Sequence, residues 1–262
     1  MSTTTRTANL LSFFRDDFRM ETWLLAGASL QVVSVLIFGR LALMLTGILL
    51  VYQLTTGLFK DQGIITTNYA RDVNWGKWST QLPDASGQAR GPGGEQIVVF
   101  LLGARSNHPR GRFTPGWAKI GEYFGDMWRD CAKNRQTNGF LGKTSTLIAT
   151  DEDCGNTMCW LSYWKDLDSL QVFANGPVHA KGMVWLNKIG LKQYPSIGIM
   201  HETYNIPKGH WETISLNTRP FGMAATQHFV QDKESGETKR ISPVVEADGK
   251  AWDRMVNRMG VA

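Results

Sequence analysis

The feature that most constrains this chain is an apolar segment near its N-terminus, between Trp23 and Phe59. A single charged residue, Arg40, divides it into an uncharged run ending at Gly39 and a second that starts at Leu41. A helix needs roughly 20 residues to cross a bilayer, with about 17 as the lower limit, and each run reaches that limit. The segment therefore predicts a helical hairpin that turns at Gly39-Arg40.

Two other interpretations of this segment stay open. It could form one tilted span with the remaining apolar residues in the membrane–water interface, or a buried helix in the core of a soluble protein. The apolar region of a secretory signal is shorter, about 7 to 15 residues, so we expect the segment to stay on the protein. A hairpin places both of its flanks on one side of the membrane. The expected location is the endoplasmic reticulum membrane, with the remainder of the chain in the cytosol and membrane lipid as a partner.

The three cysteines, Cys131, Cys154 and Cys159, agree with a cytosolic domain, because an odd number cannot all pair within one chain. Cys154 and Cys159 lack a second cysteine pair or a neighbouring histidine to complete a zinc set, so no metal site is predicted. The formal charge is +5, but the basic residues are scattered rather than gathered into a nucleic-acid face. We expect no nucleic-acid partner, and anionic lipid explains the excess charge.

Composition divides the chain into five parts. They are an N-terminal flank (1–22), the membrane segment (23–59), a linker rich in Gly and Pro (60–95), a folded domain (96–230) and a polar tail (231–262). The folded domain is long enough to bury a core without disulfides.

Periodicity within this domain alternates between strands and helices. A continuous apolar run opens it at 97–102. Thr114 is the expected N-cap of a following helix, with Pro115 in its first turn, and a helical stripe continues as far as Cys131. Strand-like runs at 140–150 and 157–164 flank turn-forming residues, helices follow Asp166, and a last strand covers 197–204. This order predicts an α+β fold of ferredoxin-like βαββαβ type.

Helices would cover one face of such a sheet, yet its strands are apolar on both faces. A second sheet from an identical chain would bury the other face and make a dimeric α+β barrel. In a monomer, a return of the segment 211–230 across the sheet would serve instead. A homodimer is the partner that we expect.

Two histidines fall where chemistry could occur. His179 shares the apolar stripe of its helix with Met183 and Leu186, and His201 alternates with apolar residues on the last strand. If both stripes face the space between helices and sheet, the two imidazoles point into one pocket. Satisfied core histidines are the alternative reading, and the sequence leaves both readings open.

Other candidates surround these histidines. Glu202 and Tyr204 must point to the sheet face opposite His201, because side chains alternate along a strand. Tyr163 is a further candidate, and Tyr163 and Tyr204 are the residues expected to hold an oxyanion or a peroxide. Ten tryptophans suit a pocket for an apolar substrate, and three of them are candidates for substrate binding: Trp160, Trp164 and Trp211.

Several of these residues resemble a known family. The sequence Ser162-Tyr163-Trp164, His179, the run HETYNIPKGHWE from His201 to Glu212, and then Asn217, Pro220 and Gly222 resemble the fungal and bacterial monooxygenases typified by the fumagillin-pathway enzyme. That family is similar to the antibiotic-biosynthesis monooxygenases. The resemblance covers roughly 96–225, and it implies a ferredoxin-like, often dimeric fold that oxygenates a polyketide or terpenoid without a required metal or flavin.

The leading hypothesis is a membrane-anchored monooxygenase in which His179 or His201 removes a substrate proton and the resulting carbanion or enol reacts with O₂. It requires no cofactor. A haem enzyme similar to aldoxime dehydratases is one alternative, with the histidines as iron ligand and acid/base group. A cofactor-free isomerase or epoxide hydrolase and a non-catalytic membrane adaptor are the others.

Overall fold

The computed structural model describes residues 20–84, 86–89, 91, 93–149, 157–231 and 236–260. The chain forms two compact units, Met1–Asp72 and Val73–Ala262. The predicted turn 151–156, with Cys154, lies outside the described residues.

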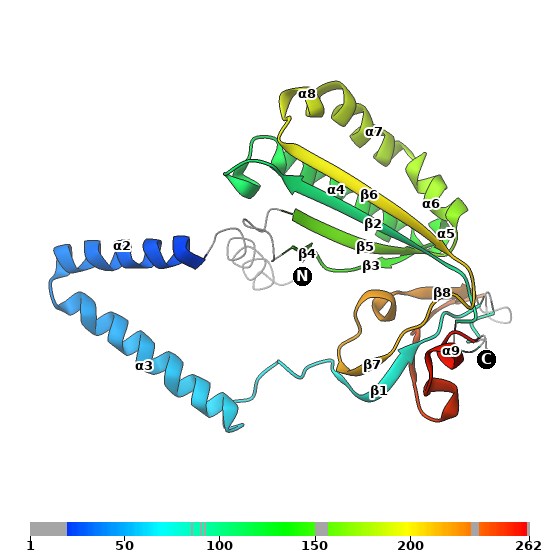
Figure 1. Ribbon diagram of the computed structural model, residues 1–262, viewed down its shortest axis with the longest axis horizontal. Coiled ribbons are helices and arrows are strands. Elements are labelled where there is room, and N and C mark those ends of the chain that lie inside the picture. The colour runs from blue at the N-terminus through cyan, green and yellow to red at the C-terminus, as the bar shows by residue number, and fades with distance from the viewer. Residues whose placement is uncertain are drawn as a thin grey trace. The chain divides into compact units, whose positions relative to one another are not determined.

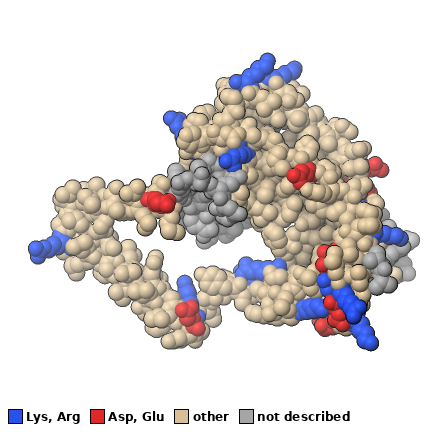
Figure 2. Space-filling model, viewed as in Figure 1, with Lys and Arg blue, Asp and Glu red and all other residues tan. Residues whose placement is uncertain are grey.

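The first unit is a pair of helices, α2 (Met20–Phe38) and α3 (Leu41–Asp61) (Figure 1). They are joined at Gly39-Arg40, where Gly39 has φ of +60°, so the predicted position of the turn is confirmed. The Thr46 hydroxyl donates a hydrogen bond to Gln31 Oε1 (2.6 Å) and links the two helices. Both helices are long and apolar enough to cross a membrane. Figure 2 shows an uncharged surface along them, with charged residues near their ends.

The second unit is built around an antiparallel sheet in the order β3-β5-β2-β6. Its strands are β2 (Ile97–Ser106), β3 (Phe140–Lys143), β5 (Thr157–Trp164) and β6 (Ile197–Ile206), and the short β4 (Leu147–Ile148) also pairs with β5. The fold is therefore α+β, and the sheet has the strand order of the predicted split βαβ arrangement.

Helices cover one face of this sheet: α4 (Trp117–Lys133), α6 (Leu167–Ala174) and α7 (Pro177–Trp185) (Figure 1). A π-helical turn (Leu186–Gly190) continues α7 into α8 (Leu191–Gln193), and the single-turn α5 (Arg135–Asn138) follows α4. Asp166 caps α6 as predicted, because its side chain accepts a hydrogen bond from the Ser169 N–H (2.8 Å).

The start of α4 differs from the prediction that Thr114 caps it. The Thr114 hydroxyl instead bonds to the Gly111 carbonyl (2.6 Å), and Gly116 precedes the helix with φ of +87°. A Cβ at Gly116 would lie 2.4 Å from the Tyr194 ring, so only glycine fits there.

The main core lies between the helices and the sheet. The buried side chains of Leu102 and Ala104 on β2 pack with those of Ile120, Phe124 and Met127 from α4. Leu102 and Ala104 share one face of the strand, and the three residues of α4 belong to its predicted helical stripe.

A second sheet corrects the predicted linker and tail. Within 60–95, strand β1 (Asn74–Thr80) pairs with β7 (Ser215–Thr218) and with β10 (Val244–Glu246) from the tail. The Ser79 hydroxyl also donates a hydrogen bond to the Thr213 carbonyl (2.6 Å). Neither segment has an apolar run that would mark a strand. The strands of this sheet instead pair with residues that are distant in the sequence.

The tail continues through further short elements. Strands β8 (His228–Gln231) and β9 (Thr238–Ile241) form a hairpin, and α9 (Met255–Arg258) ends the described part. The described part of this unit also contains three single-turn 3-10 helices: Gly111–Phe113, Gly222–Ala225 and Lys250–Trp252. Arg258 forms an ion pair with Glu212 (2.5 Å), which is largely shielded from water and holds the tail against the chain.

The sheet face opposite the helices is covered only in part. At one end, Trp211 and Met223 pack with Ile97 and Tyr163, so the segment 211–230 does return across the sheet there. On β6 this face is open: Met200 is 45% and Tyr204 49% exposed.

Candidate active site

Strand β6 presents His201 and Glu202 to opposite faces of the sheet. His201 pairs with Leu102, whose side chain lies in the core beneath the helices, and Glu202 pairs with Leu101. The His201 ring lies against Phe100, with the ring centres 5.4 Å apart. His201 is therefore on the helix side of an edge strand, where its ring is exposed to solvent.

His179 on α7 has one ring nitrogen fixed by the backbone. Its Nδ1 lies 2.7 Å from the Ala174 carbonyl oxygen, which can only accept a hydrogen bond, so Nδ1 carries a proton. In the neutral ring Nε2 is then the nitrogen with a free electron pair. The arrangement gives His179 a defined tautomer with Nε2 available as a base or as a ligand to a metal.

One aromatic cluster connects the two histidines. His179 packs against Phe173 (5.5 Å between ring centres), and Phe173 packs against Trp164 (5.3 Å). Phe100, which contacts His201, borders the same core. The structure thus places both predicted histidines at the margin of one apolar cluster, each against a different ring.

Glu202 and Tyr204 form a pair on the opposite, open face. The Tyr204 hydroxyl donates a short hydrogen bond to the Glu202 carboxylate. This bond, and the negative charge of Glu202, raise the pKa of Tyr204. The pair cannot share a pocket with His201 across a regular sheet.

Tyr163 also belongs to the face opposite the helices, but it is buried. Burial raises the pKa of its phenol. Its hydroxyl lies against the backbone of Gly222, which has φ of +60°, and a Cβ there would come within 2.9 Å of the Tyr163 oxygen. Gly222, one of the motif residues, is therefore needed for close packing against Tyr163.

The three predicted tryptophans have different surroundings. Trp164 is fully buried between Phe140 and Phe173, and its indole N–H donates to the Ser162 hydroxyl (3.1 Å). Trp211 is also buried, with its N–H donated to the Glu95 carbonyl (2.6 Å). Both indoles are core residues in this structure. Trp160 is half-buried beside Phe124, and of the three it alone has substantial access to solvent.

The two described cysteines are thiols in apolar surroundings. Burial raises the pKa of Cys131 to about 12 and also raises the pKa of Cys159. A thiol with a raised pKa is a poor nucleophile at neutral pH. Within the described ranges, no group of three or more His, Cys, Asp and Glu side chains gathers as metal ligands do.

Sequence reasoning missed one further histidine, His228 on β8. The Thr226 hydroxyl donates to the Met223 carbonyl (2.6 Å), so its oxygen accepts a hydrogen bond from His228 Nε2 (2.9 Å). The side chain is buried and lines a cavity of about 610 Å³. None of the predicted site residues lines this cavity. The surrounding sequence, with a polar tail directly after it, has no pattern that predicts burial.

His228 should make stability depend on pH. Burial lowers its pKa from 6.5 to about 4, so between these values the unfolded chain binds more protons than the folded chain. The free energy of unfolding should therefore fall by up to about 3 kcal/mol as the pH decreases from 6.5 to 4. Urea unfolding of the full chain in nanodiscs at both pH values measures this, and the decrease should be much smaller in His228→Gln. An equal decrease in the variant would contradict it.

Comparisons with known proteins agree with these features. The model of a family described as "Monooxygenase af470-like" matches residues 97–223, from the start of β2 into the 3-10 helix that contains Gly222. The curated protein Monooxygenase af470 of Aspergillus fumigatus is 30% identical over 261 residues, which cover 97% of this chain and 92% of that protein.

Two solved structures are similar over part of the chain. SnoaB, described as a cofactor-independent oxygenase from Streptomyces nogalater, is 18% identical with a TM-score of 0.30, over 42% of this chain and 92% of that protein. An aldoxime dehydratase is 18% identical with a TM-score of 0.41, over 57% of this chain and 45% of that protein. TM-scores this low carry no weight in the assignment. The sequence identity to Monooxygenase af470 and the match to the family model show that this chain belongs to the af470-like monooxygenase family.

Proposed function

We propose that this monooxygenase is anchored in a membrane and oxygenates an apolar polyketide or terpenoid intermediate of secondary metabolism, with His179 as the base. The observation that carries the proposal is the hydrogen bond from His179 Nδ1 to the Ala174 carbonyl. It leaves Nε2 with a free electron pair beside an aromatic cluster, which suits removal of a proton from an apolar substrate.

The chemistry can be written without an external reductant. His179 Nε2 takes a proton from an activated CH₂ group of the substrate, and the carbanion forms a C–O bond with O₂ to give a peroxide. The peroxide takes a proton, and removal of the second hydrogen from that carbon breaks the O–O bond. The products are a ketone and water, so one oxygen atom enters the substrate and the other leaves as water. The carbon supplies the electrons.

The other predicted residues take different places in this proposal. His201 is a second proton carrier on the same side of the sheet. Tyr163, Glu202 and Tyr204 lie on the other face, and holding an oxyanion or peroxide would require a substrate that reaches that face. Trp160 is the tryptophan with most access to a substrate.

Two experiments test the reaction. Metabolites of a host with and without this chain identify the compound that accumulates in its absence, and that compound is then supplied to membranes that carry the chain. With labelled O₂ the proposal expects one labelled oxygen atom in the product and one in water. Label that enters only from water would indicate a hydrolase, and a product without new oxygen an isomerase. A chain whose removal changes metabolites without any turnover would be an adaptor.

The membrane anchor is proposed from the two helices of the first unit. Their large apolar side chains are exposed, for example Leu36 (79%) and Leu41 (70%), which favours a lipid environment over water. Within α3, Thr56 satisfies its hydroxyl on the Tyr52 carbonyl (2.8 Å), as residues in apolar surroundings must. A hairpin would place the monooxygenase unit in the cytosol, on the endoplasmic reticulum.

Deleting residues 20–61 should release the chain from membranes. We expect the full chain in the membrane pellet after a carbonate wash and the deletion variant in the supernatant. In sealed microsomes, protease should remove a tag at the C-terminus of the full chain. Protection of that tag would contradict the cytosolic orientation.

A homodimer through the open sheet face is the expected assembly. Met200 and Tyr204 expose apolar surface there, next to the Glu202 carboxylate. Met200→Arg should convert a dimer into a monomer in light scattering of the detergent-solubilised chain. Trp75→Arg changes an aromatic residue that is 71% exposed on the other sheet, and should leave the dimer intact. Equal masses for both variants would argue against this interface.

Haem remains an alternative, because His179 would also serve as an iron ligand: its Nδ1–H is held by a carbonyl, as in many metal-bound histidines. When bound, haem would supply iron-based redox or Lewis-acid chemistry. A Soret band that is present in the purified full chain and lost in His179→Ala would favour this alternative.

A further inference from the structure

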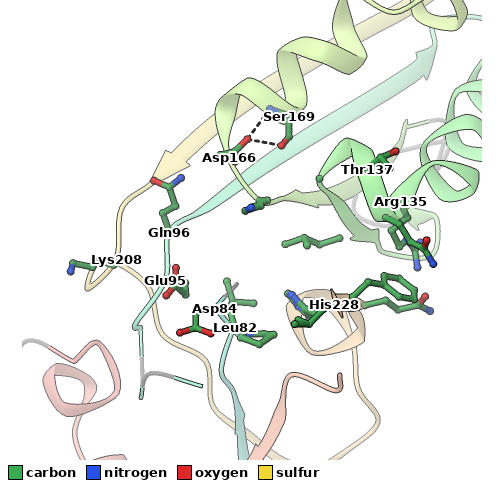
Figure 3. A pocket seen from close by; sticks show the side chains of 18 of the residues that line it. Leu82, Asp84, Glu95, Gln96, Arg135, Thr137, Asp166, Ser169, Lys208 and His228 are labelled. Atoms are coloured by element: carbon green, nitrogen blue, oxygen red, sulfur yellow. Dashed lines mark hydrogen bonds between the residues drawn. The ribbon is translucent and has the colours of Figure 1, made fainter. Parts of the chain in front are cut away.

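The cavity of about 610 Å³ lies at the end of the main sheet where β2 and β3 begin and β5 and β6 end (Figure 3). Its size is within the range of small-molecule pockets, about 300 to 1,000 Å³. Residues from several loops and from β8 line it, including Gln96 before β2, Lys165 after β5, Lys208 after β6 and His228 on β8. The proposed reaction uses none of them.

Two acidic residues of the cavity lining, Asp166 and Asp84, accept hydrogen bonds from residues a few positions further along the chain. Asp166 Oδ1 accepts hydrogen bonds from the Ser169 N–H (2.8 Å) and hydroxyl (2.5 Å), as Figure 3 shows. Asp84 Oδ1 accepts from the Ser86 N–H (2.8 Å), the Ser86 hydroxyl (2.6 Å) and the Gln88 N–H (3.1 Å). These two carboxylates stabilise a helix start and a turn, and Glu95 is the third acid of the lining.

Arg135 on α5 is one of three cations in the described lining, with Lys165 and Lys208. Its Nε is buried and, among the described residues, makes no hydrogen bond, while its guanidinium lies over the Phe140 ring (5.2 Å). Burial and the nearby charge of Arg240 both lower its pKa. An anion beside the terminal nitrogens would offset this cost, and a planar carboxylate matches the guanidinium best.

His228 would pair with a hydrogen-bond donor, whereas Arg135 would pair with an anion that accepts hydrogen bonds. Because Nε2 donates its proton to Thr226, Nδ1 is the acceptor of the neutral ring, and His228 is among the residues that line the cavity. Nδ1 makes no hydrogen bond to any described residue, so a hydroxyl that donates would satisfy it. Apolar side chains form much of the remaining lining: Leu82, Leu141, Phe229 and Val230.

We propose that this cavity is a second binding site, for an apolar hydroxy carboxylic acid whose carboxylate meets Arg135 and whose hydroxyl donates to His228 Nδ1. The site lies apart from His179 and does not depend on oxygen chemistry. It therefore goes beyond the proposed reaction and stands or falls separately from it.

Three related probes test this with the full chain in nanodiscs. They are the hydroxynaphthoic acid with its two groups at opposite ends of the ring system, naphthoic acid, which lacks the hydroxyl, and naphthol, which lacks the carboxylate. Calorimetry measures their dissociation constants, with empty nanodiscs subtracted. We expect the hydroxynaphthoic acid to bind at least about tenfold more tightly than naphthol, which lacks the charged hydrogen bonds to Arg135, and about threefold to tenfold more tightly than naphthoic acid, which lacks the neutral one to His228.

Variants assign the two contacts. Arg135→Gln should weaken binding of both acids about tenfold and leave naphthol unchanged, and His228→Phe should weaken the hydroxylated probes only. Lys133→Gln removes a similar charge outside the cavity and should change nothing. Equal affinity of the wild type for all three probes would overturn the proposal, as would an unchanged affinity in folded Arg135→Gln. The wild-type probe series decides the matter if a variant does not fold.

Discussion

Replacing His179 by Ala should lower the rate of product formation by about 100-fold or more. A positioned general base contributes about 100- to 10,000-fold to a reaction of this kind. The Ala174 carbonyl fixes the tautomer of His179, so replacement by Ala removes both the base and its orientation. The measurement is single-turnover conversion of the accumulated compound by membranes that carry equal amounts of each chain.

His210→Ala is the matched control, because His210 is an exposed histidine in the loop after β6 and should be silent. His201→Ala should have a smaller effect than His179→Ala, since the His201 ring is open to solvent. Full activity in both His179→Ala and His201→Ala would rule out histidine base catalysis while leaving the family assignment intact.

Trp164→Ala should destabilise the second unit by about 3 to 5 kcal/mol, the usual cost of truncating a buried aromatic residue. Trp164 is fully buried, packs edge-on against Phe140 and at a tilt against Phe173, and its indole N–H donates a hydrogen bond to the Ser162 hydroxyl. Phe173 in turn supports His179, so residual activity should fall as well. Urea unfolding of the full chain in nanodiscs, followed by near-UV circular dichroism, measures the difference.

Trp75→Ala provides the comparison for this stability change. Trp75 is 71% exposed on β1, and its removal should alter the free energy of unfolding by less than about 0.5 kcal/mol. Similar losses in the two variants would mean that Trp164 is not a central packing residue.

The elements that could be predicted are those with local signals. The apolar run of β2, the stripe of α4 and the Asp166 cap each specify an element within a few residues, and together they gave the order of the main sheet. The hairpin turn at Gly39 followed from one charge and one glycine in an apolar segment. Strands β1 and β10 could not be predicted, because each is stabilised by a partner far away in the sequence.

In the candidate site, too, only features with a local sequence signal could be predicted. Alternation along β6 separated His201 from Glu202 correctly, since it depends only on strand geometry. The role of Trp164 could not be decided from its spacing on β5, because a substrate-binding face and a core face both have a period of two. Trp211 lies outside the strands, where no such period applies. The burial of His228 could not be predicted, because it depends on the packing of a hairpin whose sequence has no apolar pattern.

The pairing of β1 with β10 also bears on the order of events during synthesis. Residues 78–80 pair with 244–246, so the second sheet stays incomplete until residue 246 has left the ribosome. The two apolar helices precede β1 and emerge long before the sheet can close. With the proposed membrane anchor, a nascent chain would be tethered to the bilayer while its strand edges are still unpaired, which limits how far an aggregation-prone intermediate can diffuse. The proposed anchor would then assist folding as well as localisation.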